Sequence, residues 1–550
     1  MKRILQTVGA AVLAAALVFG AAACGTAGTT QGTTAAPSAG TTAPASGEKM
    51  VTIGMTYPIT SMNPLYLDAS EAMKYAVGIS FEPILELNSD NVFVGVLAES
   101  VTANEDGTVF TVKLNDDAKW SDGQPVTADD VIFTVLKTTS KTVSNPSMAG
   151  YSQLKGFDPG TGQVADDATE VEGLVKVDEK TVEFHAEYSM SLESFNNNFM
   201  RYLLPIPKHV LGEKTTAELA TTDWFLAPEV VSGPFRVTSA DVAQYVTYEK
   251  NENYWQGEPK LDKVNIRIVT SSQLFAGLKS GEIDFVQQTT GVFAQEDIDS
   301  VSSLENADEV YDKPVTSVLA FINNESVPDA RVRKAILHAI DRELLVKEFL
   351  KGKGEVVDGF LTSATPYFDE TLEVTPYDPD QAKALLAEAN WDASKTLTFK
   401  IDSGDATFAQ AANVIVAQLG EVGIKVQLQT LSFTQLLTDA GNHDFDMMTV
   451  QYTLSTVAPA FDISWLTAPS GWPLYNNPEV DALVEEAMIV SGDVPKLKSL
   501  YREINEIMQE EVPIFNAYAL SPLGAKAKRV VYAAPSVFGG FMDMHLWDIG

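Results

Sequence analysis

The sequence predicts an α/β fold with more than one domain, and three observations support this prediction. The chain has 550 residues, which is longer than one ordinary domain. Its 45% hydrophobic and 20% charged residues give the balance of a soluble globular protein. Strand-like segments dominate the middle of the chain, whereas helices alternate with strands after about residue 315, a pattern typical of α/β domains.

Charge and cysteine content exclude several classes of protein. The 74 acidic residues outnumber the 38 basic ones and give a net charge of -36, which argues against a nucleic-acid partner. The single cysteine, Cys24, leaves no intrachain disulfide and no thiolate cluster for a metal.

The N-terminus predicts export and a lipid anchor. Residues 1–23 read as a signal peptide, because Lys2 and Arg3 precede an uncharged apolar run that ends in small residues. A run of this kind directly before Cys24 resembles the bacterial lipobox, which implies that this cysteine is diacylated and becomes the new N-terminus. An uncleaved membrane-spanning helix is the alternative, but the run is short for a span.

Residues 24–49 then predict a flexible tether. From Gly25 to Glu48 the chain is made of Gly, Ala, Thr, Ser and Pro with two exceptions, Gln31 and Glu48 itself. Such a composition cannot bury a core. We therefore expect folded material to begin near Met50.

The first half of the folded part predicts mainly short strands. A helix is expected after Thr127, a possible N-cap that precedes two aspartates, and another over 273–279, which Gly281 ends. Strands are expected at 51–57, 108–114, 171–177, 181–185, 233–237, 245–249, 263–269 and 283–286.

The second half predicts a helix-rich domain. Asp329 can cap a single helix over 330–350, and Asp378 followed by Pro379 marks the start of another helix. Further helices are expected at 408–422, 478–490 and 495–510, with a strand at 424–428 and strand-like segments after Val512.

Several motifs in order along the chain resemble one family. Leu97 to Ser100, Lys119 to Gly123 and Ala128 to Val131 together look like the signature of family-5 extracellular solute-binding proteins, the peptide- and nickel-type receptors of bacterial ABC importers. Further stretches that resemble the family are LPIPKHV at 204–210, SGPF at 232–235, KNENYW at 250–255, SGEID at 280–284, DARVRKAILHAIDR at 329–342, GIKV at 423–426 and NNPEVD at 476–481.

The resemblance implies a two-lobed periplasmic-binding-protein-like fold of type II, cluster C, with an extra subdomain in the first lobe. Lobe I would comprise residues 50–315 plus 520–550, with the extra subdomain at about 80–220. Lobe II would comprise residues 316–519. Closure about two hinge strands would remove the ligand from water and strengthen its polar contacts.

The resemblance also places a ligand loop in lobe II. Peptide-binding relatives capture the ligand's α-amino group with an aspartate of a loop that corresponds to residues 452–459 here. The matching positions are neutral, at Ser455 and Ala458, although Asp462 lies near enough to substitute. The stretch from Glu343 to Tyr501 also contains no arginine, so lobe II offers no bidentate guanidinium for a carboxylate, and only lysines such as Lys351 or Lys353 remain.

This loop and its surroundings are instead rich in aromatic and hydroxyl side chains. They suit a ligand held by backbone hydrogen bonds and stacking, such as a longer or blocked peptide or a neutral glycan. An equally weighted alternative places Trp465 and Trp472 in the core. The candidate ligand-binding residues of lobe II are Tyr452, Thr453, Ser455, Phe461, Trp465 and Trp472; those of lobe I, which follow its first strand, are Tyr57, Thr60, Ser61 and Met62.

No metal site or cofactor is predicted. The five histidines have no helical pair spacing, although His443 with Asp444 and Asp446 could bind a metal adventitiously.

These observations lead us to expect a monomeric, non-enzymatic, lipid-anchored extracytoplasmic receptor. It would capture a peptide or other small solute between its lobes and deliver it to the transmembrane subunits of an ABC permease. A cell-surface glycosidase or peptidase is the alternative, although Gly-x-Ser-x-Gly and His-Glu-x-x-His are absent from the sequence, as is a Ser-x-x-Lys paired with Lys-Thr-Gly. A ligand sensor on the same fold is a third possibility.

Overall fold

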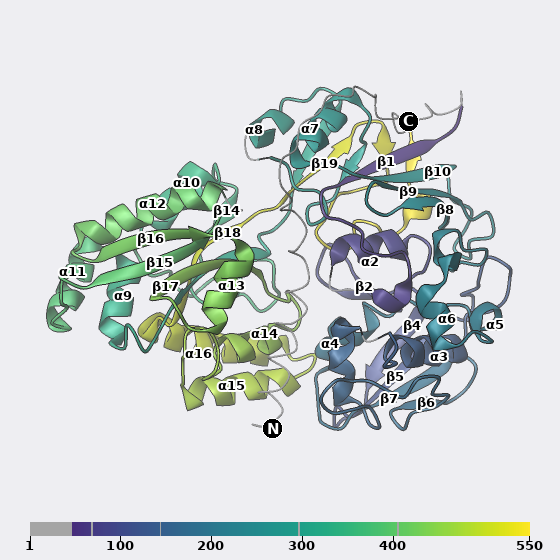
Figure 1. Ribbon diagram of the computed structural model, residues 1–550, viewed down its shortest axis with the longest axis horizontal. Coiled ribbons are helices and arrows are strands. Elements are labelled where there is room, and N and C mark those ends of the chain that lie inside the picture. The colour runs from purple at the N-terminus through teal and green to yellow at the C-terminus, as the bar shows by residue number, and fades with distance from the viewer. Residues whose placement is uncertain (1–46, 68–69, 144, 295–296, 404–405) are drawn as a thin grey trace, which may run out of the picture.

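The protein is built on two large sheets, each with its own core (Figure 1). A computed structural model describes residues 47–67, 70–143, 145–294, 297–403 and 406–550. The predicted signal peptide, Cys24 and nearly all of the tether lie outside these residues. We call the part built on the seven-stranded sheet lobe I and the part built on the six-stranded sheet lobe II.

Lobe I contains the seven-stranded sheet and a smaller four-stranded sheet, and one continuous hydrophobic core joins them. In the large sheet β1 (Met50–Met55) is central and pairs in parallel with β10. In order, the sheet contains β12 (Ala307–Tyr311), β19 (Leu523–Ala527), β11 (Phe285–Val286), β1, β10 (Lys263–Ile268), β9 (Tyr245–Lys250) and β8 (Phe235–Asp241).

The four-stranded sheet and several short helices form a second part of lobe I. The sheet order is β4 (Ala98–Ala103), β5 (Val109–Leu114), β7 (Thr181–His185) and β6 (Leu174–Lys176), and a separate hairpin joins β2 (Leu85–Leu87) to β3 (Phe93–Gly95). The helices of lobe I are α2 (Glu71–Gly78), α3 (Ala128–Thr138), α4 (Leu192–Phe195), α5 (Lys208–Leu211), α6 (Thr216–Thr221), α7 (Ser271–Ser280) and α8 (Ile298–Val301).

Lobe II contains the six-stranded sheet with helices on both faces (Figure 1). Alternate residues of its strand β13 (Thr316–Ile322) enter two different cores: Val318 and Ala320 enter one, and Leu319 and Phe321 enter the other. The sheet order is β14 (Gly354–Glu355), β18 (Ile514–Leu520), β13, β17 (Met447–Thr453), β15 (Thr396–Asp402) and β16 (Lys425–Leu431).

Three predicted helices of lobe II begin at the expected residues, Ala330, Pro379 and Pro478, but the first of them is an exception in its length. Asp378 accepts hydrogen bonds from Asp380 N and Gln381 N, and Asn477 caps the helix that starts at Pro478. The helices are α9 (Ala330–His338), α10 (Arg342–Phe349), α11 (Pro379–Glu388), α12 (Ala406–Glu421), α13 (Phe433–Gly441), α14 (Pro459–Leu466), α15 (Pro478–Ile489) and α16 (Val494–Glu511).

The exception is the single helix predicted over 330–350, which is wrong. The helix ends at His338, and Asp341 starts a new one by accepting a hydrogen bond from Leu344 N at 2.9 Å. Arg342 then points into the structure, where it pairs with Asp358 at 2.6 Å. A continuous helix could not place both caps and this buried ion pair.

The chain passes between the sheets twice. It leaves the seven-stranded sheet at Tyr311 and enters the six-stranded sheet at Thr316, then returns between Leu520 and Leu523.

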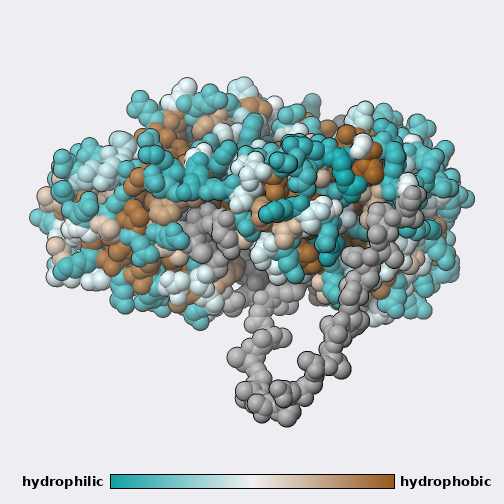
Figure 2. All heavy atoms as spheres, turned by 90° about the horizontal axis from the view of Figure 1, so that it is seen from above, coloured by the Kyte–Doolittle hydropathy of each residue, from teal (hydrophilic) through white to brown (hydrophobic). Residues whose placement is uncertain are grey.

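Seen from above, apolar residues are scattered among polar ones over both lobes (Figure 2). Among the described residues, no helix is both long and apolar enough to span a membrane.

Candidate functional site

The candidate ligand loop of lobe II joins the end of β17 to α14. Tyr452 and Thr453 end the strand, and α14 begins at Pro459, a favoured first helical residue. Ser455 Oγ accepts a hydrogen bond from Ala458 N at 3.0 Å, and Tyr367 OH donates one to Val457 O at 2.9 Å. The loop is therefore held by both local and distant contacts.

Asp462 is the polar centre of this loop. One of its carboxylate oxygens accepts a hydrogen bond from Tyr452 OH at 3.0 Å, and the other accepts one from Ser455 N at 2.8 Å. Trp465 Nε1 donates to Tyr452 OH at 3.1 Å. Burial raises the pKa of Asp462 to about 6, although both hydrogen bonds favour its charged form. Asp462 thus organises the loop, and its oxygens are engaged by the protein itself.

The aromatic residues predicted for the site extend from this centre into the core. The Trp465 ring lies 5.8 Å from Tyr452 and 5.1 Å from Trp472, and Trp472 lies 5.2 Å from Phe321. Trp472 is only 6% exposed, whereas Trp465 is partly exposed. The structure therefore brings Tyr452, Ser455 and Trp465 together and places Trp472 behind them.

The two remaining predicted residues of lobe II lie at the edges of this group. Thr453 is exposed, and its Oγ1 is 2.7 Å from Thr316 Oγ1 on the neighbouring strand. Phe461 is partly exposed in the first turn of α14.

The predicted residues of lobe I follow β1 and differ in exposure. Tyr57 is 50% exposed, whereas Met62 is 2% exposed and belongs to the core of lobe I. Thr60 Oγ1 lies 3.2 Å from Met73 Sδ, and Ser61 Oγ accepts a hydrogen bond from Asn63 N at 3.0 Å. Tyr57 is therefore the large side chain of this segment that faces solvent.

Sequence reasoning missed two places where the lobes touch. At the first, Asn91 of the β2–β3 turn accepts a hydrogen bond from Thr456 Oγ1 at 3.0 Å and donates one to Ala364 O at 2.8 Å. At the second, Glu193 of α4 accepts hydrogen bonds from Ser491 Oγ at 2.8 Å and Gly492 N at 2.9 Å. The sequence signals only a turn at Asn91 and an acidic first helical turn at Glu193, because each partner lies hundreds of residues away.

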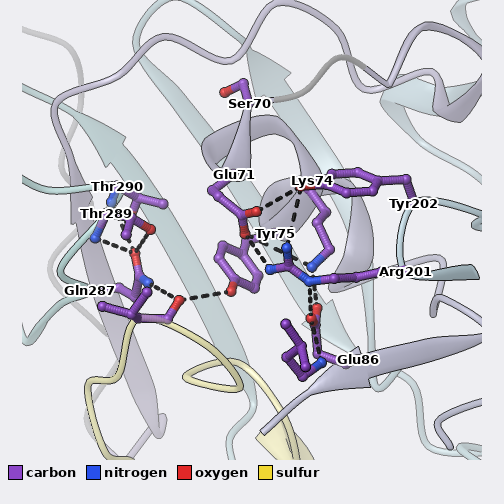
Figure 3. Close-up of polar contacts among 12 residues, drawn as sticks. Ser70, Glu71, Lys74, Tyr75, Glu86, Arg201, Tyr202, Gln287, Thr289 and Thr290 are labelled. Carbon is purple, nitrogen blue, oxygen red and sulfur yellow. Dashed lines mark hydrogen bonds and ion pairs between the residues drawn. The ribbon is translucent and has the colours of Figure 1, made fainter. Parts of the chain in front are cut away.

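Sequence reasoning also missed a buried ion network in lobe I (Figure 3). Arg201 donates to Glu86 at 2.7 Å and to Glu71 at 3.0 Å, and Lys74 also pairs with Glu86. Burial disfavours the charge of Glu71, but Arg201 and Lys74 hold its pKa below the ordinary value. The Arg201 guanidinium lies 4.8 Å from the ring of Phe538.

A small cavity of about 90 Å³ lies beside this network in lobe I. Its charged lining consists of Lys74, Glu82, Glu86 and Asp543. Glu82 accepts a hydrogen bond from Trp255 Nε1 at 3.1 Å and a second one from Tyr254 OH. Burial raises the pKa of Glu82 to about 7. The volume would hold a few water molecules rather than a peptide.

Metal-ligating residues do not gather anywhere in the part of the chain that the structure describes. Of the three residues that could bind a metal adventitiously, two have other partners. Asp444 pairs with Lys400 at 3.0 Å, and Asp446 accepts a hydrogen bond from Thr398 N at 2.8 Å. His443 Nδ1 lies 3.2 Å from Trp472 O.

Comparison with known proteins confirms the family that the motifs indicate. Residues 92–473 match the model of bacterial extracellular solute-binding proteins, family 5. The oligopeptide-binding protein AppA of Bacillus subtilis is 28% identical over 439 residues, 76% of each chain. The nickel-binding periplasmic protein of Escherichia coli is 23% identical and covers 80% of this chain and 83% of its own.

The fold comparison agrees with the sequence comparison. The ABC transporter substrate-binding protein CtaP of Listeria monocytogenes superposes with a TM-score of 0.77 at 23% identity, over 91% of this chain and 99% of that one. The predicted two-lobed α/β fold is therefore confirmed. The chain belongs to the bacterial extracellular solute-binding proteins of family 5, and it is a binding protein rather than a hydrolase.

Proposed function

We propose that this protein is the lipid-anchored receptor of an ABC importer. It captures a peptide or peptide-like solute between its lobes and delivers it to the permease as a monomer. Family membership supports the receptor role, and the apolar run that ends at Cys24 supports the anchor. The Gly-, Ser- and Thr-rich tether gives the folded part room to move above the membrane.

The hydrogen bonds and the raised pKa of Asp462 are the observations that support the proposed ligand class. Both of its oxygens accept hydrogen bonds from the loop, and burial raises its pKa to about 6. An ammonium group would have to compete with Tyr452 and Ser455 for a carboxylate that burial already disfavours in its charged form. We therefore propose a ligand without a free α-amino group at this end, which is a blocked or internal peptide segment. A neutral glycan would meet the same aromatic surface.

The proposed site combines residues from both lobes. Tyr57, Thr60, Ser61 and Met62 contribute from lobe I, and Tyr452, Thr453, Ser455, Phe461, Trp465 and Trp472 from lobe II. We propose lobe bounds of 50–315 plus 520–550 and of 316–519, with the extra subdomain at about 80–220; the crossings after Tyr311 and Leu520 support these bounds.

Native mass spectrometry of the freshly purified protein tests the proposal. We expect a co-purified peptide or peptide-like molecule of defined mass, lost from Tyr452→Ala and Trp465→Ala because each truncation weakens binding by about 1 to 3 kcal/mol. Tyr377→Ala is the matched control, since Tyr377 is 41% exposed in lobe II before α11. Full retention of the ligand by both loop variants would remove the loop from the site.

Uptake separates the importer from the sensor. Cells that lack the protein should lose accumulation of the identified molecule. Unchanged uptake with a lost transcriptional response would support the sensor instead.

A further inference from the structure

The most exposed large apolar side chain among the described residues belongs to Tyr532 in lobe I. It is 73% exposed, and its backbone has a φ of +63°. This left-handed conformation costs free energy for a bulky residue. Tyr532 belongs to none of the hydrophobic cores of the described residues, so core packing does not offset the strain. A strained backbone that presents an aromatic ring to solvent points to a role outside the folded chain.

A lysine and a second apolar side chain accompany this ring. Lys260 Nζ lies 4.4 Å from the centre of the Tyr532 ring. The backbone N–H of Lys260 donates to His545 O at 3.1 Å, and the next residue, Leu546, is 41% exposed. We call the surface formed by Tyr532, Lys260 and Leu546 the tether face. Side chains with an apolar body and a polar or cationic tip are typical of membrane–water interfaces.

The folded chain begins at this face. Lys49 Nζ pairs with Asp548 at 2.6 Å. Asp548 stands opposite Val531 in a two-stranded antiparallel ladder, and Val531 directly precedes Tyr532. In Figure 1 the C-terminus accordingly lies beside β1. The predicted tether therefore joins the folded part next to the exposed tyrosine.

The point of attachment is fixed by contacts of the first described residues. Glu48 pairs with Lys263 at 2.8 Å, and Lys49 N donates to Asp262 Oδ2 at 2.9 Å. A Gly-, Ala-, Ser- and Thr-rich segment of the length of residues 25–46 spans about 25 Å between its ends. A lipid on Cys24 would hold the tether face within reach of the membrane surface.

The charge around the tether face differs from that of the whole chain. Residues 512–542 contain Lys526, Lys528 and Arg529 and no acidic residue, although 74 of the 550 residues are acidic. Lys528 and Arg529 are exposed. A chain with a net charge of -36 is repelled by anionic lipids, and the absence of carboxylates from this segment reduces the repulsion at this face.

We propose that the tether face lies against the membrane, with Tyr532 and Leu546 at the level of the lipid headgroups. This inference rests on the lipid anchor of the proposed function. Two apolar side chains bury too little area to bind a bilayer alone, so the contact forms while the anchor keeps the chain near.

Membrane contact at this face would orient lobe I. Strand β1 (Met50–Met55) starts at the tether face and leads to Tyr57 at its other end. Six strand residues span about 20 Å. The candidate ligand residues of lobe I would therefore lie about 20 Å from the membrane contact, at the opposite end of the strand.

Fluorescence quenching of the lipidated protein on vesicles tests the proposal. The vesicles contain equal parts of phosphatidylcholine and phosphatidylglycerol, with a nitroxide on some headgroups. Because Cys24 carries the lipid, one introduced cysteine takes the dye: Ala534→Cys, an exposed position two residues after Tyr532, or Asp380→Cys, where the side chain is 95% exposed in lobe II. We expect quenching to be about threefold stronger at position 534 than at position 380.

Substitutions of the tether face should remove this difference. Tyr532→Asn combined with Leu546→Ser should lower the quenching at position 534 to the level at position 380, and asparagine tolerates the left-handed backbone. Tyr377→Asn is the matched control, because Tyr377 is 41% exposed in lobe II, and it should leave the quenching unchanged. Melting temperatures within a few degrees of the parent would show that the variants fold.

The possible outcomes separate this inference from the proposed function. A chain that does not float with the vesicles would refute the lipid anchor, and the membrane contact with it. A chain that floats but shows equal quenching at both positions, or quenching that survives in the double variant, would overturn the membrane contact alone. Energy transfer between copies labelled at position 534 in solution would assign the face to a second copy of the chain and would also overturn the proposal.

Discussion

Replacing Asp462 by asparagine should remove a pH dependence from the stability of lobe II. Asparagine has nearly the same shape and carries no ionisable proton. In the folded protein burial raises the pKa of Asp462 to about 6, and in the unfolded chain an aspartate titrates near 4. The two states therefore bind protons differently between these pH values.

The sign and size of the effect follow from linkage. Between about pH 4 and pH 6 the folded state holds more of this proton than the unfolded state, so stability falls as pH rises through this window, and the loss persists above it. The pKa of Asp462 differs by about two units between the folded and unfolded states. This difference corresponds to a change in the free energy of unfolding of at most about 3 kcal/mol. Because Asp462 is partly exposed, solvent screening reduces this to about 1 to 2 kcal/mol.

Thermal unfolding of the parent and Asp462→Asn from pH 4.5 to 8 measures this difference. For a unit of about 200 residues, 1 to 2 kcal/mol corresponds to roughly 2 to 8 °C. We expect the melting temperature of the parent, relative to that of the variant, to fall by this amount as pH rises and then to level off. Identical pH profiles would refute a raised pKa at Asp462 and, with it, the argument against ammonium capture.

Three further predictions concern other parts of the molecule. Burial raises the pKa of Glu82 to about 7, so the stability of the parent should fall in a similar way between about pH 4.5 and 7, and Glu82→Gln should abolish this fall. Melting curves at pH 5 and pH 8 measure the fall, and a fall that survives in the variant contradicts the prediction. Gly359→Ala should destabilise lobe II by about 1 to 3 kcal/mol, because φ at Gly359 is +77° and the new Cβ would clash with Asn505 Oδ1. Gly352 has a similar φ of +75° but open space around it, so Gly352→Ala should lower the free energy of unfolding by less in the same denaturation series. Cys24→Ala should move the protein from the detergent phase to the aqueous phase in Triton X-114 partitioning; an equal distribution of both forms would argue against the lipid anchor.

Local signals explain which parts of the fold could be predicted. Asp378 with Pro379, Asn477 with Pro478 and Gly281 mark real helix ends, because a cap needs only neighbouring residues. The break at Asp341 was missed because the apolar spacing continues through it, and only Arg342 reaching the buried Asp358 shows why the helix must end.

The candidate site was less accessible to sequence reasoning. The cluster around Asp462 could be expected, since Tyr452, Ser455 and Trp465 lie within 14 residues of one another. The contacts of Asn91 and Glu193 could not, because their partners are 365 and 298 residues away and meet them only once both lobes are placed. The near-complete burial of Trp472 likewise depends on Phe321, from a strand far away in sequence.

The pairing of β13 with β18 has a consequence for how such a receptor can be rearranged. Thr316 stands opposite Leu520, so the entry and exit of the inserted lobe sit side by side in one antiparallel ladder. A segment whose two ends meet can be exchanged for the matching segment of a relative at two adjacent junctions. The contribution of lobe II to ligand binding could thus be exchanged as one segment while lobe I stays unchanged.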